Sequence, residues 1–173
     1  MDKKGIIIYK GKYGATQQYA TWLAAALDIQ AVTAGKETKE QLSNAAYVIL
    51  GTSIYIGKLQ LRRWISNHTD QLADKRLFLF LVAGTPVSEK QKLEAYLNAN
   101  ISAGIRSRCK CFFLPGKLEF RKLSRLDRWL LTIGARLAKG RSETIVTADY
   151  NHVRPENLDD IIKAVRAANE VPA

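Results

Sequence analysis

Residues 10–16 combine residue types suited to binding a phosphate group. Gly11 and Gly14 would let the backbone approach a ligand closely, and Thr16 offers a hydroxyl donor. The segment follows the short apolar run 5–9 and leads into a stretch with helical periodicity. A helix that begins here would present unpaired backbone N–H groups and partial positive charge to an anion.

This segment matches neither of the two best-known phosphate fingerprints. It lacks the G-x-G-x-x-G of dinucleotide-binding folds and the G-K-[ST] that closes a Walker loop. An ordinary connection between a strand and a helix, whose glycines only make the turn, is therefore the alternative interpretation. The first candidate binding segment consists of Lys10, Gly11, Lys12, Tyr13, Gly14, Ala15 and Thr16.

The elements around this segment alternate between strands and helices. Strands are predicted at 5–9, 29–33, 47–51, 76–82 and 109–114, with a short extended piece at 144–147. Helices are predicted from Thr16, at 38–42, 59–72, 88–98, 123–137 and 155–168, with Thr38 and Ser88 as N-caps. Such alternation predicts one α/β domain over residues 1–173, with a parallel sheet covered on both faces.

Two further candidate segments follow the third and fourth predicted strands. Ligands of such sheets bind at the carboxyl ends of the strands, so these segments would line one crevice with the first. Tyr55 could stack on a planar ring, although an exposed turn aromatic is the alternative. The segments consist of Thr52, Ser53, Ile54, Tyr55, Ile56 and Gly57, and of Ala83, Gly84, Thr85 and Pro86.

Cysteine and histidine are too few and too scattered to suggest a metal site. Cys109 and Cys111 are expected on one face of a strand as small apolar residues, poorly placed to bond each other. His68 and His152 are isolated in the sequence. We predict no metal ligands and name no catalytic side chain.

The sequence resembles flavodoxin-like proteins, and more narrowly the flavodoxin-type, menaquinone-dependent protoporphyrinogen dehydrogenases of bacteria. Gly14-Ala15-Thr16 matches the end of their first loop, and residues 51–57 reproduce their Gly-x-Ser-Ile-x-x-Gly motif. Residues 116–120 match a Gly-x-Leu-x-aromatic segment, and 126–129 contain the Asp-Arg of a basic helix. The resemblance covers nearly the whole chain. It implies a doubly wound five-stranded parallel sheet, order 2-1-3-4-5.

This resemblance implies one noncovalent FMN, with its phosphate on the first segment and its ring between the second and third. The flavin would carry out the redox chemistry, so no catalytic side chain is required. The chain has Lys10 and Gly11 where relatives have Ser or Thr hydroxyls. Lys10 and Lys12 could offset that loss with charge, although a chain that has lost FMN is an alternative.

Positive charge is concentrated between residues 105 and 141. The 173-residue chain has a formal net charge of +11, and this stretch holds eleven Lys or Arg against Glu119 and Asp127. The helix predicted there could simply cover the sheet, with its basic side in solvent. Alternatively, its surface could lie against anionic lipid or attract a porphyrin's propionates. Nucleic acid is the least favoured partner, since no recognition motif accompanies the charge.

Several functions are compatible with these features. The leading one is FMN-dependent redox chemistry: oxidation of protoporphyrinogen, as in heme biosynthesis, with transfer to a membrane quinone. A non-catalytic electron carrier and a flavodoxin-fold interaction module without cofactor are the alternatives. No apolar run approaches the ~20 residues of a membrane span. We expect a cytoplasmic protein that can lie peripherally at the inner face of the cell membrane.

Overall fold

The computed structural model describes residues 4–139 and 148–170. The chain divides into two compact units, the first formed by 1–116 with 153–173 and the second by 117–152. Whether the chain behaves as one domain stays a prediction. Among the described residues, no helix has the length and apolar character needed to cross a bilayer.

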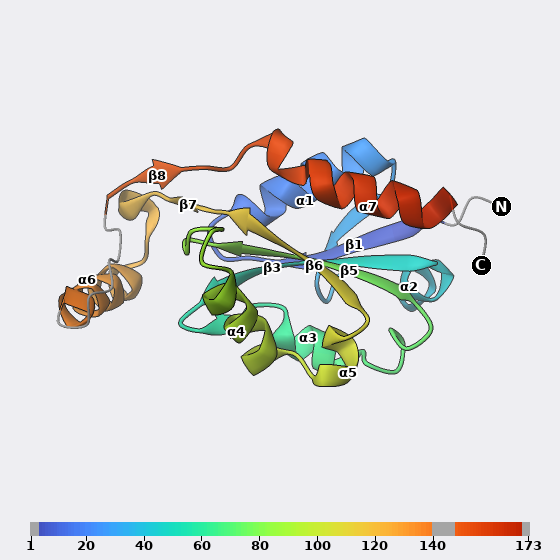
Figure 1. The fold of residues 1–173 in the computed structure, drawn as a ribbon, viewed down its shortest axis with the longest axis horizontal. Coiled ribbons are helices and arrows are strands. Elements are labelled where there is room, and N and C mark those ends of the chain that lie inside the picture. Colours follow the sequence, from blue (N-terminus) through green and yellow to red (C-terminus); the bar gives the residue numbers. More distant parts are fainter. Residues whose placement is uncertain (1–3, 140–147, 171–173) are drawn as a thin grey trace. The chain divides into compact units, whose positions relative to one another are not determined.

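The first unit is built on a parallel sheet whose strand order is β2-β1-β3-β5-β6. The short β4 pairs only with β3 and lies outside this order. Without β4, the five main strands follow the predicted order 2-1-3-4-5, which confirms the doubly wound arrangement. Figure 1 shows β1 and β3 in the middle of the molecule's layers, between helices. The strands are β1 (Gly5–Lys10), β2 (Gln30–Thr33), β3 (Tyr47–Tyr55), β4 (Lys58–Leu59), β5 (Arg76–Ala83) and β6 (Cys109–Pro115).

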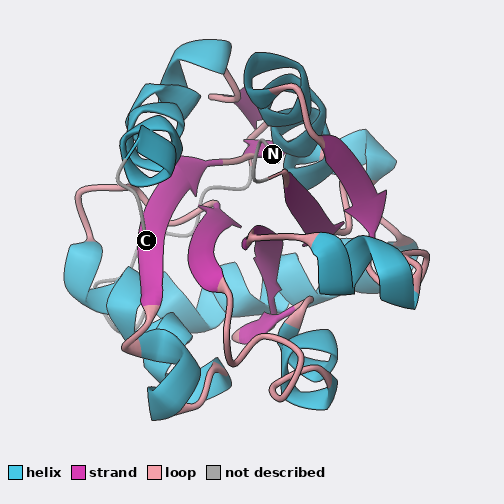
Figure 2. Cartoon of the chain, turned by 90° about the vertical axis from the view of Figure 1, so that its right-hand side faces the viewer, coloured by secondary structure: helices cyan, strands magenta, loops and turns pink. Residues whose placement is uncertain are grey.

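Helices cover both faces of this sheet, as Figures 1 and 2 show. The helices α1 (Ala15–Leu27) and α7 (Asp159–Glu170) pack on the face that carries Ile7 and Phe80. Four others pack on the face that carries Ile8 and Leu50. They are α2 (Lys39–Asn44), α3 (Arg62–Asn67), α4 (Lys90–Asn100) and α5 (Ala103–Arg106).

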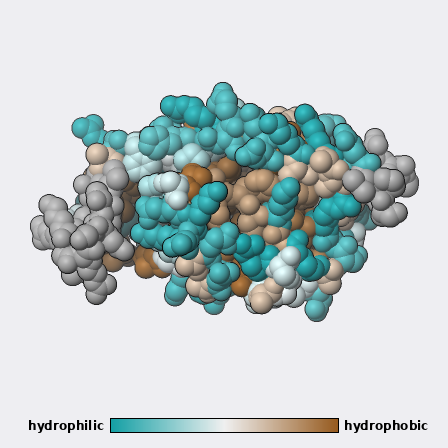
Figure 3. All heavy atoms as spheres, in the orientation of Figure 1, coloured by the Kyte–Doolittle hydropathy of each residue, from teal (hydrophilic) through white to brown (hydrophobic). Residues whose placement is uncertain are grey.

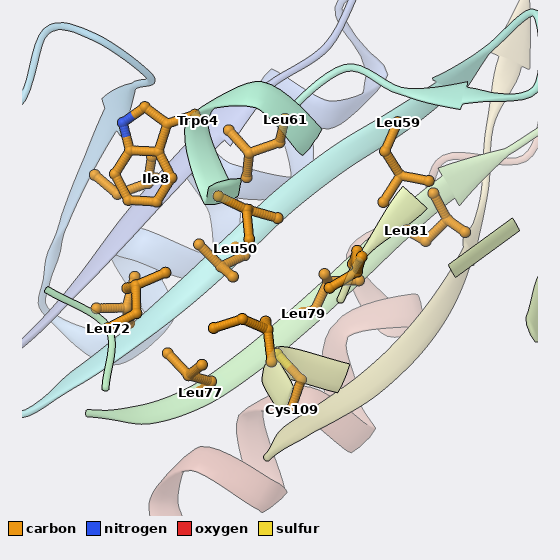
Figure 4. Packing of buried hydrophobic residues seen from close by; sticks show 14 of the residues in the cluster. Ile8, Leu50, Leu59, Leu61, Trp64, Leu72, Leu77, Leu79, Leu81 and Cys109 are labelled. Atoms are coloured by element: carbon orange, nitrogen blue, oxygen red, sulfur yellow. The ribbon is translucent and has the colours of Figure 1, made fainter. Parts of the chain in front are cut away.

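Burial on both faces explains why the strands read as continuous apolar runs. Ile7 and Ile8 point to opposite faces, and both are fully buried. The face that carries Leu50, Leu79 and Leu81 is drawn in Figure 4, where Trp64 of α3 packs on the same cluster. The surface view of Figure 3 shows mostly hydrophilic residues, with hydrophobic ones between them.

The prediction of a helix at 59–72 is wrong over most of its length. Residues 58–59 form β4, and only α3 (Arg62–Asn67) is α-helical. The apolar residues of the prediction are nonetheless buried together: Leu59, Leu61, Trp64, Ile65 and Leu72. The spacing of these residues correctly predicted that they are buried against the sheet. A hairpin, a short helix and turns can bury them as well as one long helix can.

The two predicted helix caps have different outcomes. Thr38 caps α2 as predicted: its Oγ1 accepts from the Gln41 N–H at 3.0 Å, and Gln41 Oε1 accepts from the Thr38 N–H at 2.8 Å. Ser88 does not cap α4, which begins at Lys90 without a side-chain cap. A turn closed by the Glu89 N–H and the Pro86 carbonyl, at 2.9 Å, precedes that helix.

The C-terminal helix of the first unit has two parts. A 3₁₀ turn, η2 (Pro155–Leu158), precedes α7 (Asp159–Glu170), so the predicted helix 155–168 extends to Glu170. Proline is tolerated in the first turn because no N–H is needed there. Leu158 and Ile161 are buried in the apolar cluster on the face of the sheet that α1 covers.

The second unit holds a small hairpin and a long helix. Strand β7 (Lys117–Leu118) pairs antiparallel with β8 (Tyr150–Asn151), and η1 (Phe120–Lys122) leads to α6 (Arg125–Lys139). The Ser124 hydroxyl accepts a hydrogen bond from the Asp127 N–H at 3.1 Å, which helps begin α6. The extended piece predicted at 144–147 lies outside the described residues.

Cys109 and Cys111 lie on β6 and contact the same apolar cluster, as their spacing predicted. Both are free thiols, with Cys109 buried and Cys111 half-buried. A hydrogen bond with Cys111, together with burial, raises the pKa of the Cys109 thiol. The same hydrogen bond lowers the pKa of Cys111. Cys109 therefore stays protonated and behaves as a small core residue.

The ring of Phe80 on β5 requires a glycine at position 51 of β3. Gly51 lies directly opposite Phe80, and a Cβ added at Gly51 would meet Phe80 Cζ at 2.3 Å. Phe80 is fully buried, so its ring is enclosed by the core. We expect Gly51→Ala to lower the free energy of unfolding by about 1–3 kcal/mol, because the core is overpacked. Chemical denaturation of both proteins measures this difference.

Two variants control this prediction. A Cβ at Gly104 of α5 meets nothing within 4 Å, so Gly104→Ala should change stability by less than about 0.5 kcal/mol. Adding Phe80→Leu to Gly51→Ala should recover part of the loss, because the clash is removed. Wild-type stability in Gly51→Ala would show that Phe80 moves without cost.

Candidate functional site

The three candidate segments lie at the carboxyl ends of three adjacent strands of the sheet. Strands β1, β3 and β5 are adjacent and parallel, so their carboxyl ends point the same way. Thr52 of β3 pairs with Lys10 of β1 on one side and with Leu81 of β5 on the other. The sequence therefore brings these segments to neighbouring positions, as predicted from the strand order.

The first segment turns sharply into α1 at Gly14. Gly14 is the N-cap, with φ 81° and ψ −16°, a left-handed conformation that glycine adopts at little cost. No side chain caps this helix, so its first-turn N–H groups have no side-chain acceptor at the cap. The N-terminus of a 13-residue helix with such an end favours an anion, and phosphate binding there stays a prediction.

Thr16 lies in the first turn of α1, next to Gly11 of the loop. A Cβ added at Gly11 would meet Thr16 Oγ1 at 2.4 Å, so Gly11 leaves the space that Thr16 fills. Thr16 is only 1% exposed. Gly11 is thus explained by the packing of Thr16, and the role of the Thr16 hydroxyl toward a phosphate stays a prediction.

Tyr19 fixes the orientation of α1 relative to the end of β6. Its hydroxyl donates to the Pro115 carbonyl at 2.8 Å and accepts from Asn157 Nδ2 at 2.8 Å. Burial raises the pKa of Tyr19, although the Asn157 hydrogen bond opposes this, and the hydroxyl therefore stays protonated as a donor. The helix whose N-terminus forms the site is thereby held to the sheet.

Most of the second segment is strand, although the sequence predicted a loop after Gly51. Strand β3 continues to Tyr55 because Thr52 and Ser53 still pair with β5, and Ile54 and Tyr55 pair with β4. Thr52 is fully buried, and its Oγ1 accepts from the Leu61 N–H at 3.1 Å. That hydroxyl holds the start of α3 in place.

The tip of the β3–β4 hairpin is strained. Tyr55 and Lys58 pair across a two-residue turn whose residues, Ile56 and Gly57, both have positive φ, 48° and 68°. This is the pattern of a type I′ turn. A β-branched residue rarely adopts that conformation, which costs about 1–2 kcal/mol. Ile56 is nevertheless 63% exposed, so no burial compensates for its strain.

Asn100, which sequence reasoning missed, anchors this hairpin to α4. Its Oδ1 accepts from the Leu59 N–H at 3.1 Å, and its Nδ2 donates to the Gly57 carbonyl at 3.0 Å and to the Tyr96 carbonyl at 2.8 Å. The two contacts to the hairpin each span more than forty residues of chain. No local pattern in the sequence could have revealed them.

Lys12 and Tyr55 bring the first two segments into contact. Lys12 Nζ lies 3.5 Å from the centroid of the Tyr55 ring and 5.6 Å from that of Tyr13. A cation–π contact of this kind contributes ~0.5–2 kcal/mol. It places a positive charge between the glycine loop and the aromatic residue predicted to stack on a ring. Stacking by Tyr55 stays a prediction.

The third segment continues directly from β5. Ala83 is the last residue of that strand and is buried, while Gly84 and Pro86 are exposed. The Ala83 carbonyl accepts from the Gly116 N–H at 2.9 Å, which ties the end of β5 to the end of β6. A Cβ at Gly116 would lie 3.1 Å from that carbonyl oxygen, so the two segments approach closely. The binding roles of residues 83–86 stay predictions.

Comparison with known proteins places this chain in a family. The family model described as a flavodoxin domain matches residues 6–144, which is most of the chain. No curated protein matches the sequence.

Solved structures show only remote likeness. A flavodoxin from the domain Archaea is 14% identical, covering 81% of this chain and 99% of its own, with a TM-score of 0.41. The Trp repressor binding protein from Bacillus subtilis is 17% identical, covering 80% and 99%, with a TM-score of 0.42. At these values the likenesses carry no functional argument. By the match over residues 6–144, the chain belongs to the flavodoxin domain family.

Proposed function

We propose that this chain binds FMN at the carboxyl ends of β1, β3 and β5 and serves flavin-dependent redox chemistry. Family membership supports a flavin cofactor, of which FMN is the typical one. The observation that carries the proposal is the uncapped N-terminus of α1 behind Gly14, with Tyr55 beside it. When bound, FMN would supply the electron transfer.

Different residues of this chain would bind different parts of FMN. The N–H groups that follow Gly14 suit the phosphate, and Lys12 adds positive charge nearby. Tyr55 offers an aromatic face, and Lys12 would have to leave that face for a ring to stack there. The exposed residues of 83–86 supply backbone groups at the neighbouring strand end.

Our narrower proposal is oxidation of protoporphyrinogen with transfer of electrons to a membrane quinone. It is supported by the resemblance of residues 51–57, 116–120 and 126–129 to the bacterial flavodoxin-type dehydrogenases. The carrier alternative needs the same flavin but no porphyrinogen site. The cofactor-free module is favoured only by Lys10 and Gly11, which stand in place of hydroxyl residues.

Helix α6 supports a membrane-surface role for the second unit. Leu126 and Trp129 are each 60% exposed, which does not fit a helix whose apolar side is fully buried. Exposed cationic residues lie close by in sequence: Arg121, Lys122 and Arg125. Exposed aromatic and aliphatic side chains flanked by cations suit the interface of an anionic bilayer, where each Lys or Arg contributes ~1 kcal/mol. Charges at Arg136, Lys139 and Arg141 lie where the side chains are not described.

The phosphate end of the site is tested by two substitutions. Gly14→Val should weaken FMN affinity by more than about a hundredfold, because valine disfavours φ 81° and the backbone turn is lost. Thr16→Ala should weaken it by about tenfold at most, because it removes one hydroxyl group. Titration of apo-protein, followed by quenching of flavin fluorescence, measures both affinities, and thermal melting checks that each variant folds.

Equal, near-normal affinities in the two variants would show that the glycine loop is not the phosphate site. Absence of saturable binding in the wild-type protein would overturn the flavin proposal as a whole. The chain would then be a flavodoxin-fold interaction module.

Turnover separates the dehydrogenase from the carrier. The FMN-loaded protein, mixed anaerobically with protoporphyrinogen and a menaquinone, should form protoporphyrin while the quinone is reduced to quinol. Protoporphyrin fluorescence and the quinone's ultraviolet absorbance follow the two halves of the reaction, and omission of the protein gives the spontaneous rate. Flavin reduction by a soluble reductase, without any porphyrinogen oxidation, would identify a carrier instead.

Vesicle binding tests the surface of α6. The wild-type protein should sediment with phosphatidylglycerol vesicles and much less with phosphatidylcholine vesicles, and salt should weaken the binding. Leu126→Glu with Trp129→Glu should reduce partitioning by about tenfold or more, because two interfacial anchors become anionic. Val87→Glu, an exposed apolar site of the first unit, is the control. Unchanged binding of the double variant would rule out α6 as the contact.

A further inference from the structure

A pocket of about 350 Å³ lies within the first unit, between the end of β1, the β3–β4 hairpin and the start of α3. Four cations line it: Lys10, Lys58, Arg62 and Arg63. We call it the cationic pocket. Its remaining lining includes the Tyr55 and Ile56 side chains and the buried Leu59. The pocket shares Lys10 with the glycine loop, residues 10–16, and Tyr55 and Ile56 with the second candidate segment.

The positive charges of this pocket are not neutralised by the protein. No carboxylate lines it. None of the ion pairs in the described part of the chain involves its four cations. Like charges gathered in one concavity repel one another, and a pocket lined by one sign of charge attracts counter-ions.

Two of the cations also lie where the helix itself disfavours them. Arg62 and Arg63 begin α3, and its first turn contains no acidic residue. The dipole of a helix makes positive charge unfavourable at this end. This placement neither caps the helix nor fills the core, because both side chains are exposed. A bound anion would relieve the mutual repulsion of the four cations.

The chemistry of the lining indicates phosphate groups. Guanidinium groups donate paired hydrogen bonds to phosphate oxygens, and lysine ammonium groups add charge without fixed geometry. Four cations exceed the charge of one phosphate, and Tyr55 with Ile56 adds an apolar wall for an organic substituent. We propose that the cationic pocket binds a diphosphate group, free or carried by a nucleotide, at a subsite that adjoins the proposed FMN site and that both ligands can occupy together.

Calorimetric titration of the full chain with inorganic pyrophosphate tests this site, in the presence and absence of saturating FMN. Pyrophosphate should bind in both cases, more tightly than orthophosphate, and ADP should bind at least as tightly as pyrophosphate. Arg62→Gln with Arg63→Gln should weaken pyrophosphate binding by about tenfold or more. The control, Lys110→Gln with Lys163→Gln, removes the same charge from exposed sites outside the pocket and should change affinity less than about twofold.

Each other outcome overturns the proposal. Competition between pyrophosphate and FMN would show that the pocket holds the flavin's own phosphate. Equal weakening in the control would show nonspecific attraction to a basic protein. The Arg variant should melt no lower than wild type without ligand, since its charges oppose the helix dipole. A chain that fails to bind FMN still reports on pyrophosphate, so the two proposals fail separately.

Discussion

The pairing of β3 on both sides is the constraint on which the rest of the structure depends. Its backbone is shared between β1 and β5, and its last residues also pair with β4. Gly51 leaves room for the ring of Phe80, the residue opposite it on β5. A slip of one residue would turn every side chain of the strand to the opposite face. Register at Gly51 therefore sets where each strand ends, and so where the candidate segments lie.

Much of the fold followed from the sequence because buried parallel strands leave continuous apolar runs. Four of the five main strands were predicted to within one residue of their bounds for that reason, whereas β3 extends four residues beyond its predicted end. The stretch 59–72 shows the limit of this reasoning. Leu59, Leu61 and Leu72 are buried as predicted, yet only part of the stretch is helical. Apolar spacing reports which residues face the core, and several backbone paths can satisfy the same burial.

The geometry of the candidate site was predictable where it is local, as in the turn at Gly14 that leads into α1. It was not predictable where contacts join distant residues. The β3–β4 hairpin has Ile56 at a turn position that normally carries Asn, Asp or Gly, so no turn signal was present. Asn100, which secures that hairpin, lies more than forty residues away. The cationic pocket likewise forms only when Lys10 meets the start of α3.

Two costs coincide around that hairpin. Ile56 keeps a backbone conformation that β-branched residues avoid, and Arg62 with Arg63 opposes the dipole of α3. Neither feature buries apolar surface or satisfies a buried polar group. Since natural sequences are otherwise locally consistent, conflicts of this kind concentrate where binding requires them. The strained tip and the unpaired cations therefore support our proposals for ligand binding at the carboxyl ends of the strands, as the uncapped helix behind Gly14 does independently.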